Sequence, residues 1–183
     1  MNFLLINGSP RRSGNTKAAL TLIKNRLSTL KDTANIYDVG PEARAACTGC
    51  GACKGGGACV IGDTKELAAA ISAADGIIIA TPTYYANAAG TLTALLSRLI
   101  RTERAAFFKK PCAAIAIGRR AGVCEAAGEI YKFFEFTSSP IVTASYPLGI
   151  FNAREMDSEG EGYLTELADN MHAVAACLAG KYR

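Results

Sequence analysis

The sequence predicts an α/β fold in which helices cover both faces of a parallel β-sheet. Short apolar runs alternate with stretches of helical periodicity, and this alternation repeats five times along the chain. Such a pattern favours parallel strands, because each crossover helix returns the chain to the same end of the sheet. The chain has 183 residues, and 50% of them are hydrophobic, which suits one domain with a sizeable core. We therefore treat residues 1–183 as one domain, with no internal repeat or linker.

The first unit combines a strand, an unusual loop and a helix. Residues 3–6 form an apolar run of the length of a buried strand. Apolar residues at positions 20, 23, 27 and 30 predict a helix. The loop between them, residues 8–16, is rich in hydroxyls, amides and glycines, and it exceeds the roughly two to six residues of ordinary βα loops. Backbone N–H groups and the helix dipole would make this loop a phosphate site; the alternative is a plain solvated turn.

The loop sequence favours a terminal monophosphate over a nucleoside triphosphate or a dinucleotide. A Walker A loop needs a lysine after its second glycine, and here Asn15 stands after Gly14. The fingerprint Gly-x-Gly-x-x-Gly of a pyrophosphate site is also missing.

The remaining elements follow in the same alternation. Asp63 and Glu66 have the spacing of a capping box at the start of the second helix. Further strands are predicted over residues 33–39, 76–80, 112–117 and 141–144. Helices are predicted from the apolar positions 67, 70, 71 and 74, from positions 92, 95, 96 and 99, over residues 125–134, and from positions 164, 167, 171, 174 and 178.

Ligands of open parallel sheets bind outside the carboxyl ends of the strands, where the strand order reverses. The loops predicted at that edge include residues 81–90, which read Thr-Pro-Thr-Tyr-Tyr-Ala-Asn-Ala-Ala-Gly, and the glycine-flanked pair Arg119-Arg120. The two tyrosines could face a flat ligand or cap the core. The two arginines could stabilise an anionic ligand or simply be solvated.

Seven cysteines in a chain that opens on a core strand, and not on a signal peptide, indicate a reducing cytosol. Cys47, Cys50, Cys53 and Cys59 follow the spacing C-x2-C-x2-C-x5-C. Structural zinc sites usually separate two pairs of ligands by a dozen or more residues, whereas this compact run is typical of a [4Fe–4S] cluster. A redox-active thiol pair is the competing interpretation. The other cysteines, Cys112, Cys124 and Cys177, are predicted to be small core residues.

Composition excludes several classes of function. The net charge of +4 is spread along the chain without basic blocks, so nucleic acid is not an expected partner. No run of about 18 apolar residues predicts a membrane span. A hydrolytic Ser-His-Asp set or a histidine metal site is not expected either, because His172 is the only histidine and is predicted to be structural or solvated.

Together, these motifs resemble the flavodoxin-like FMN proteins, in particular the NADPH-dependent FMN reductases and the iron–sulfur flavoproteins. The resemblance rests on the phosphate loop, on Pro82-Thr83-Tyr84 and on the cysteine run, and it spans most of the chain. It implies a five-stranded parallel sheet in the order 2-1-3-4-5. One departure is Ser97-Arg98, where relatives commonly carry Asp-Arg.

The resemblance also implies which residues hold the cofactors. Contacts to the FMN phosphate would come from the first loop, and contacts to the flavin ring from the loops after the third and fourth strands. The implied cofactor-binding residues are Ser9, Arg11, Ser13, Asn15, Thr16, Pro82, Thr83, Tyr84, Tyr85, Asn87, Gly118, Arg119 and Gly122. Cys47, Cys50, Cys53 and Cys59 would bind the cluster in the loop over residues 47–59.

The function implied is a cytoplasmic FMN-dependent oxidoreductase of the iron–sulfur flavoprotein type. The flavin would carry the chemistry, and a redox protein or a small molecule would donate or accept electrons. An NAD(P)H-dependent FMN or quinone reductase without a cluster is the first alternative, and a non-catalytic flavin- or metal-binding module is the second. The resemblance further implies a homodimer or homotetramer in which cluster and flavin face each other across subunits.

Overall fold

A parallel sheet forms the centre of the molecule in the computed structural model, which describes residues 1–145, 148–152 and 155–182. The first four strands run parallel in the predicted order, with β1 between β2 and β3, and β4 beyond β3. The strand order reverses between β1 and β3, so loops that follow these two strands meet at one edge. These strands are β1 (Asn2–Asn7), β2 (Thr33–Asp38), β3 (Gly76–Pro82) and β4 (Cys112–Gly118).

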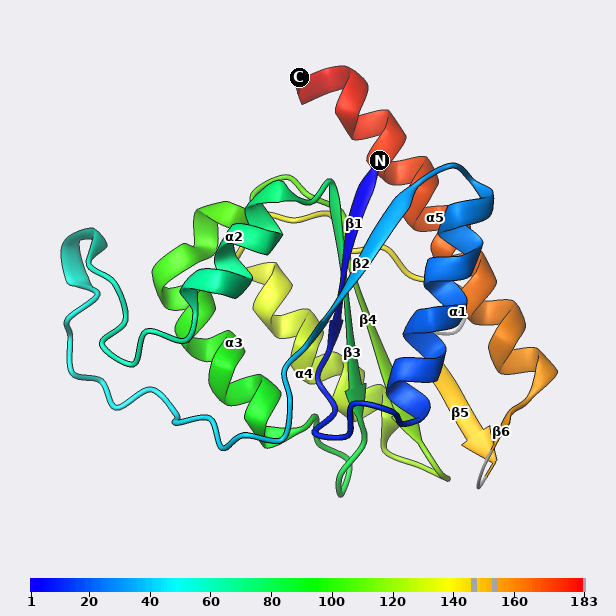
Figure 1. Cartoon of the computed structure of the whole chain (residues 1–183), viewed down its shortest axis with the longest axis horizontal. Helices are drawn as coiled ribbons and strands as arrows, with labels where there is room; N and C mark the ends of the chain where they lie inside the picture. Colours follow the sequence, from blue (N-terminus) through cyan, green and yellow to red (C-terminus); the bar gives the residue numbers. More distant parts are fainter. Residues whose placement is uncertain (146–147, 153–154, 183) are drawn as a thin grey trace.

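Helices pack on both faces of this sheet, as the sequence predicts (Figure 1). One face carries α1 (Asn15–Thr29) and α5 (Ser158–Tyr182). The other face carries α2 (Lys65–Ala73), α3 (Gly90–Glu103) and α4 (Val123–Glu135), with the short 3-10 helix η2 (Arg104–Phe107) after α3. Within the described ranges, no helix is long and apolar enough to cross a membrane.

The alternating side chains of the strands divide the core into two layers. Leu4, Ile6, Ile77 and Ile79 face α2, α3 and α4, while their neighbours in the strands face α1 and α5. This division follows from the period-two geometry of a strand, and burial on both faces explains why β1, β3 and β4 are largely apolar, whereas the partly exposed strand β2 is not.

The predicted strand over residues 141–144 is wrong. Only Ile141 of that segment forms a bridge with the start of β4, and its side chain remains 43% exposed. The carboxyl half of β4 pairs instead with β5 (Leu148–Asn152), to which β6 (Glu155–Met156) is antiparallel. The edge of β4 thus contacts two segments, Ile141 at its start and β5 along its carboxyl half. Apolar β-branched residues alone do not indicate which of these segments continues the sheet.

Two of the three isolated cysteines were also predicted wrongly. Cys112 lies buried at the start of β4, and burial raises the pKa of its thiol to about 12. Cys124 and Cys177 are exposed, because each lies away from the apolar face of its helix. His172 is half-buried, and its Nδ1 lies 2.7 Å from Oδ2 of the buried Asp32, in agreement with a structural role.

Gly8 begins the first loop at a point where β1 and β3 leave no room for a side chain. Its N–H donates to the carbonyl of Ala80 at 2.8 Å. A Cβ on Gly8 would lie 2.5 Å from Cδ2 of Leu92 and 2.8 Å from that carbonyl oxygen. The loop can therefore enter the sheet edge only with glycine at this position.

We predict that Gly8→Ala lowers the free energy of unfolding by about 1–3 kcal/mol, because the added methyl overpacks a rigid site. The control is Gly128→Ala, where the helix α4 has open space around the added Cβ. That substitution should raise stability by about 0.5–1 kcal/mol. Urea denaturation of both variants measures the difference, and equal midpoints would contradict the packing argument.

Candidate functional site

Three loops at the carboxyl edge of the sheet enclose a cavity of about 420 Å³. The loops follow β1, β3 and β4, which are the loops that the sequence singles out. Ten of the thirteen predicted cofactor-binding residues line the cavity, together with Gly14 and Ile117. The ten are Ser9, Arg11, Ser13, Asn15, Thr16, Pro82, Thr83, Tyr84, Gly118 and Arg119.

Side chains at the ends of β1 and β2 fix the start of the phosphate loop. The buried Asn7 donates from Nδ2 to Asp38 at 2.8 Å, and its Oδ1 accepts the N–H of Ser9 at 3.2 Å. Ser9 Oγ in turn accepts the N–H of Arg11 at 3.1 Å. Burial alone would raise the pKa of Asp38, but hydrogen bonds from Lys17 and Asn7 outweigh it and hold that pKa below its ordinary value.

The N-terminus of α1 opens into this cavity without a capping side chain. Its N-cap residue is Gly14, which makes no side-chain cap, and the first turn holds no acidic residue. The first N–H groups of a helix have no partner inside the helix, and the dipole makes their surroundings positive. Thr16 is buried in this first turn, and Arg11 and Arg119 bring cations to the cavity. The arrangement suits a phosphate dianion.

The loop after β3 turns sharply beside the cavity. Tyr84 and Asn87 exchange backbone hydrogen bonds of 2.9 and 3.0 Å. Between them, Tyr85 (φ 51°) and Ala86 (φ 64°) are both left-handed, as the two central positions of a type I′ turn require. The turn leaves Tyr84 at the cavity and Tyr85 fully exposed. The two tyrosines therefore do not cap the core.

Two features of the cavity wall leave room and a free hydroxyl for a ligand. Thr83 Oγ1 is buried and has no hydrogen-bond partner within the described protein. A Cβ on Gly118 would lie 3.2 Å from this oxygen and 2.5 Å from Cγ1 of Val123, so glycine keeps the wall open. Buried hydroxyls are rarely left unpaired, and a bound polar group would satisfy this one.

Three predicted residues do not line the cavity: Tyr85, Asn87 and Gly122. Asn87 supports the turn, because its Nδ2 donates to the carbonyl of Tyr85 at 2.9 Å. Gly122 has φ 82°, and a Cβ there would lie 2.7 Å from Cα of Ala86. Gly122 thus allows the loops after β3 and β4 to touch.

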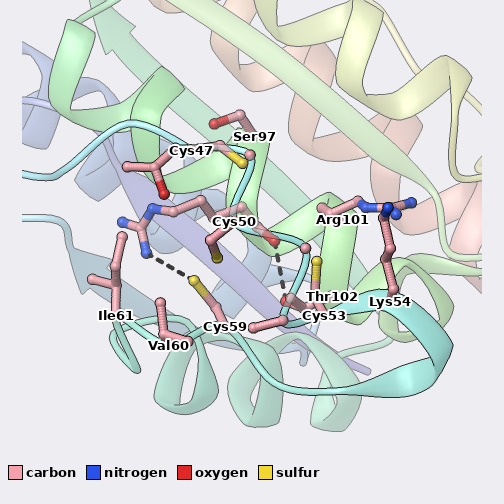
Figure 2. Close-up of a pocket in the computed structure, with 15 residues that line it drawn as sticks. Cys47, Cys50, Cys53, Lys54, Cys59, Val60, Ile61, Ser97, Arg101 and Thr102 are labelled. Atoms are coloured by element: carbon pink, nitrogen blue, oxygen red, sulfur yellow. Dashed lines mark hydrogen bonds between the residues drawn. The ribbon is translucent and has the colours of Figure 1, made fainter.

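The four clustered cysteines line a second cavity of about 250 Å³, between the loop after β2 and helix α3. Figure 2 shows Cys47, Cys50, Cys53 and Cys59 around this cavity, which Ser97, Arg101 and Thr102 of α3 also line. The loop includes the short helix η1 (Lys54–Gly56), and four of its glycines between positions 49 and 56 have positive φ. In Figure 1 this cyan loop projects from the body of the fold.

A buried arginine beside these thiols was not predicted from the sequence. Arg98 of α3 is 2% exposed, and its guanidinium forms a bidentate ion pair with Asp63. The hydrogen bond to this carboxylate raises the pKa of Arg98, and the same bond lowers the pKa of Asp63. Asp63 was predicted to cap α2 with Glu66, but α2 has no side-chain cap. The sequence did contain one sign that Arg98 is buried: position 98 lies three residues after Leu95, on a largely apolar face of the helix.

Cys59 is the cysteine nearest to this charge. The N–H of Ile61 and the Arg98 guanidinium both stabilise its thiolate, and together they lower its pKa against the opposing effect of burial. Within the described residues, no three His, Cys, Asp or Glu side chains are arranged to hold a single metal ion. A [4Fe–4S] cubane instead takes one thiolate on each of four irons, so its ligands surround a cavity. Four cysteines around one cavity fit that donor set.

Comparison with known proteins identifies the family of this chain. The family model of the NADPH-dependent FMN reductases matches residues 1–153. The chain is 32% identical over 177 residues to an iron-sulfur flavoprotein of Methanosarcina thermophila, with 91% of each chain covered. It is 29% identical over 162 residues to an iron-sulfur flavoprotein of Archaeoglobus fulgidus, covering 82% of this chain and 80% of the relative.

Solved structures support the fold. An apo NADH:FMN oxidoreductase superposes with a TM-score of 0.71 at 18% identity, covering 99% of this chain and 91% of the other. The match to the family model spans most of the chain, including the loops that follow β1, β3 and β4. The chain therefore belongs to the NADPH-dependent FMN reductase family and is an FMN-dependent oxidoreductase.

Proposed function

We propose that this protein is an oxidoreductase of the iron–sulfur flavoprotein type, with FMN in the cavity at the sheet edge and a [4Fe–4S] cluster in the cysteine cavity. The single observation that carries the proposal is that all four spaced cysteines line one cavity. The relatives named iron-sulfur flavoprotein support it. Bound there, the two cofactors would supply two-electron and one-electron chemistry, respectively.

The chain's own part would be to bind and orient the flavin. The uncapped start of α1 and the side chains of Ser9 and Thr16 would hold the FMN phosphate. Tyr84 and the unpaired hydroxyl of Thr83 would contact the ring. Arg119 would place positive charge beside it, where charge stabilises an anionic reduced ring.

We further propose a homodimer or homotetramer in the cytoplasm, with NAD(P)H, a redox protein or a small molecule as electron donor or acceptor. The two cavities have no lining residue in common among the described residues, and the cysteine loop projects from the body of the fold. Transfer between cluster and flavin would then be served by a neighbouring subunit that brings its flavin to this loop.

A second candidate is an NAD(P)H-dependent FMN or quinone reductase in which the cysteines bind no cluster. One observation favours it: the family whose model matches residues 1–153 is described as NADPH-dependent FMN reductase, and this description names no cluster. Iron analysis separates the two candidates.

Replacing Thr16 tests the phosphate site. We predict that Thr16→Val weakens FMN binding by about 1–3 kcal/mol, because a phosphate oxygen loses a hydroxyl donor in a buried position. Fluorescence titration of the flavin-free protein measures the affinity. The matched control is Thr21→Val, which changes an exposed hydroxyl on the same helix that donates to the carbonyl of Lys17. Equal affinities in both variants would remove Thr16 from the site.

Iron content tests the cluster. Protein purified anaerobically should hold about four irons and four sulfides per chain, the composition of a cubane. Cys50→Ser should abolish the cluster absorbance and leave FMN bound, because the flavin cavity is built from other loops. Cys177→Ser, which changes an exposed thiol on α5, should leave both cofactors in place.

Two outcomes would be decisive against the cluster. Anaerobic protein that contains FMN but takes up no iron on reconstitution would favour the plain reductase. A Cys177→Ser variant that loses iron as Cys50→Ser does would show that iron binding does not depend on the cysteine run.

A further inference from the structure

The loop that carries the four cysteines is closed at its base by one buried guanidinium. Nε of Arg98 donates to the carbonyl of Ala45, two residues before the first cysteine of the run, at 2.8 Å. Nη1 and Nη2 of the same side chain donate to Asp63, four residues after the last cysteine. Arg98 is therefore bonded to both ends of the loop at once, from a helix that lines the same cavity.

A third contact of Arg98 reaches a proposed cluster ligand. Nη1 lies 3.9 Å from Sγ of Cys59, as the dashed line at Cys59 in Figure 2 marks. With this contact, four of the five N–H groups of the guanidinium are committed to the base of the loop. Among the described side chains, Cys59 is the one thiol of the four that receives a charged donor.

A role limited to packing does not explain this arrangement well. Taking a guanidinium out of water is costly, and a buried ion pair adds little stability over an apolar pair of similar volume. Asp63 already has a second cation in Arg44, whose Nη1 lies 3.2 Å from Oδ2 and whose Nη2 donates to the carbonyl of Val39. Arg98 makes two contacts that Arg44 does not make, one with the carbonyl of Ala45 and one with the sulfur of Cys59.

We propose that Arg98 is the positioning residue of the cysteine site: it closes the base of the loop and, through its hydrogen bond to Cys59 Sγ, raises the reduction potential of the cluster that the thiolates bind. The second half rests on the proposed function. A donor to a ligating sulfur withdraws electron density from the cluster, and hydrogen bonds to sulfur are among the factors that set cluster potentials. The positive charge acts in the same direction, because it stabilises the more negative, reduced state.

Three variants of the two arginines that pair with Asp63 separate the contact with sulfur from the contact with this carboxylate. Arg98→Gln removes the charge, the ion pair and the donor to Cys59. Arg44→Gln removes a charge from the same carboxylate but no contact with sulfur. Arg98→Lys keeps the charge but loses the planar guanidinium with its fork of N–H donors. This variant replaces Arg98→Gln in the comparison if the glutamine variant does not fold. Retained FMN, bound by other loops, shows that each variant is folded.

The first measurement is a redox titration of anaerobically reconstituted protein, followed by electron paramagnetic resonance. We expect a more negative midpoint potential for Arg98→Gln than for the unmodified protein, with Arg98→Lys between them and Arg44→Gln close to the unmodified value. Equal midpoints for Arg98→Gln and Arg44→Gln would overturn the role of the sulfur contact. An unmodified protein that takes up no iron would instead overturn the proposed function.

The second measurement needs no metal. Amide hydrogen exchange over residues 46–62 of the iron-free protein should be about tenfold faster or more in Arg98→Gln, since bonds to a charged group close the loop. Unchanged exchange in that variant would overturn the role of Arg98 at the base of the loop, whether or not a cluster binds.

Discussion

Parallel pairing of β1 between β2 and β3 is the constraint on which the rest of the structure depends. Parallel strands require a crossover after each strand, so the loops that leave their carboxyl ends are all delivered to one edge. Because helices cover both faces, the central strands β1, β3 and β4 are largely apolar, and the polar residues at this edge come mainly from the strand ends and the loops. The cavity proposed for the flavin is the direct result: its wall is built from residues that end or follow β1, β3 and β4.

The cysteine cavity depends on a different interaction. Its loop follows β2 at the edge of the sheet, where none of the described strands covers it, and little apolar burial holds it. A buried ion pair between Arg98 and Asp63 fixes the loop instead, on a helix whose leucines anchor the arginine in the core. Removal of Asp63 would leave the buried guanidinium of Arg98 without its carboxylate, which is the costly way to lose such a pair, whereas removal of Arg98 would leave Asp63 paired with Arg44.

Features formed by residues that are close in sequence were predicted correctly, whereas contacts between distant residues were not. The first four strands and ten residues that line the cavity at the sheet edge were predictable, because short runs and individual loops contain the signal. The pair formed by Asp63 and Arg98 was not, since it joins residues 35 positions apart and Asp63 also fits a capping box. Strand β5 was missed because a nearby apolar segment resembled a strand, although only its first residue pairs with β4.

The central claim is that the loop between β1 and α1 holds a single terminal phosphate of a flavin. Flavin released by acid from the purified protein and separated by liquid chromatography tests it most directly. The account predicts FMN as the main species, because the uncapped helix start can take one phosphate and the chain lacks the glycine fingerprint of a pyrophosphate site. FAD as the main species would contradict it.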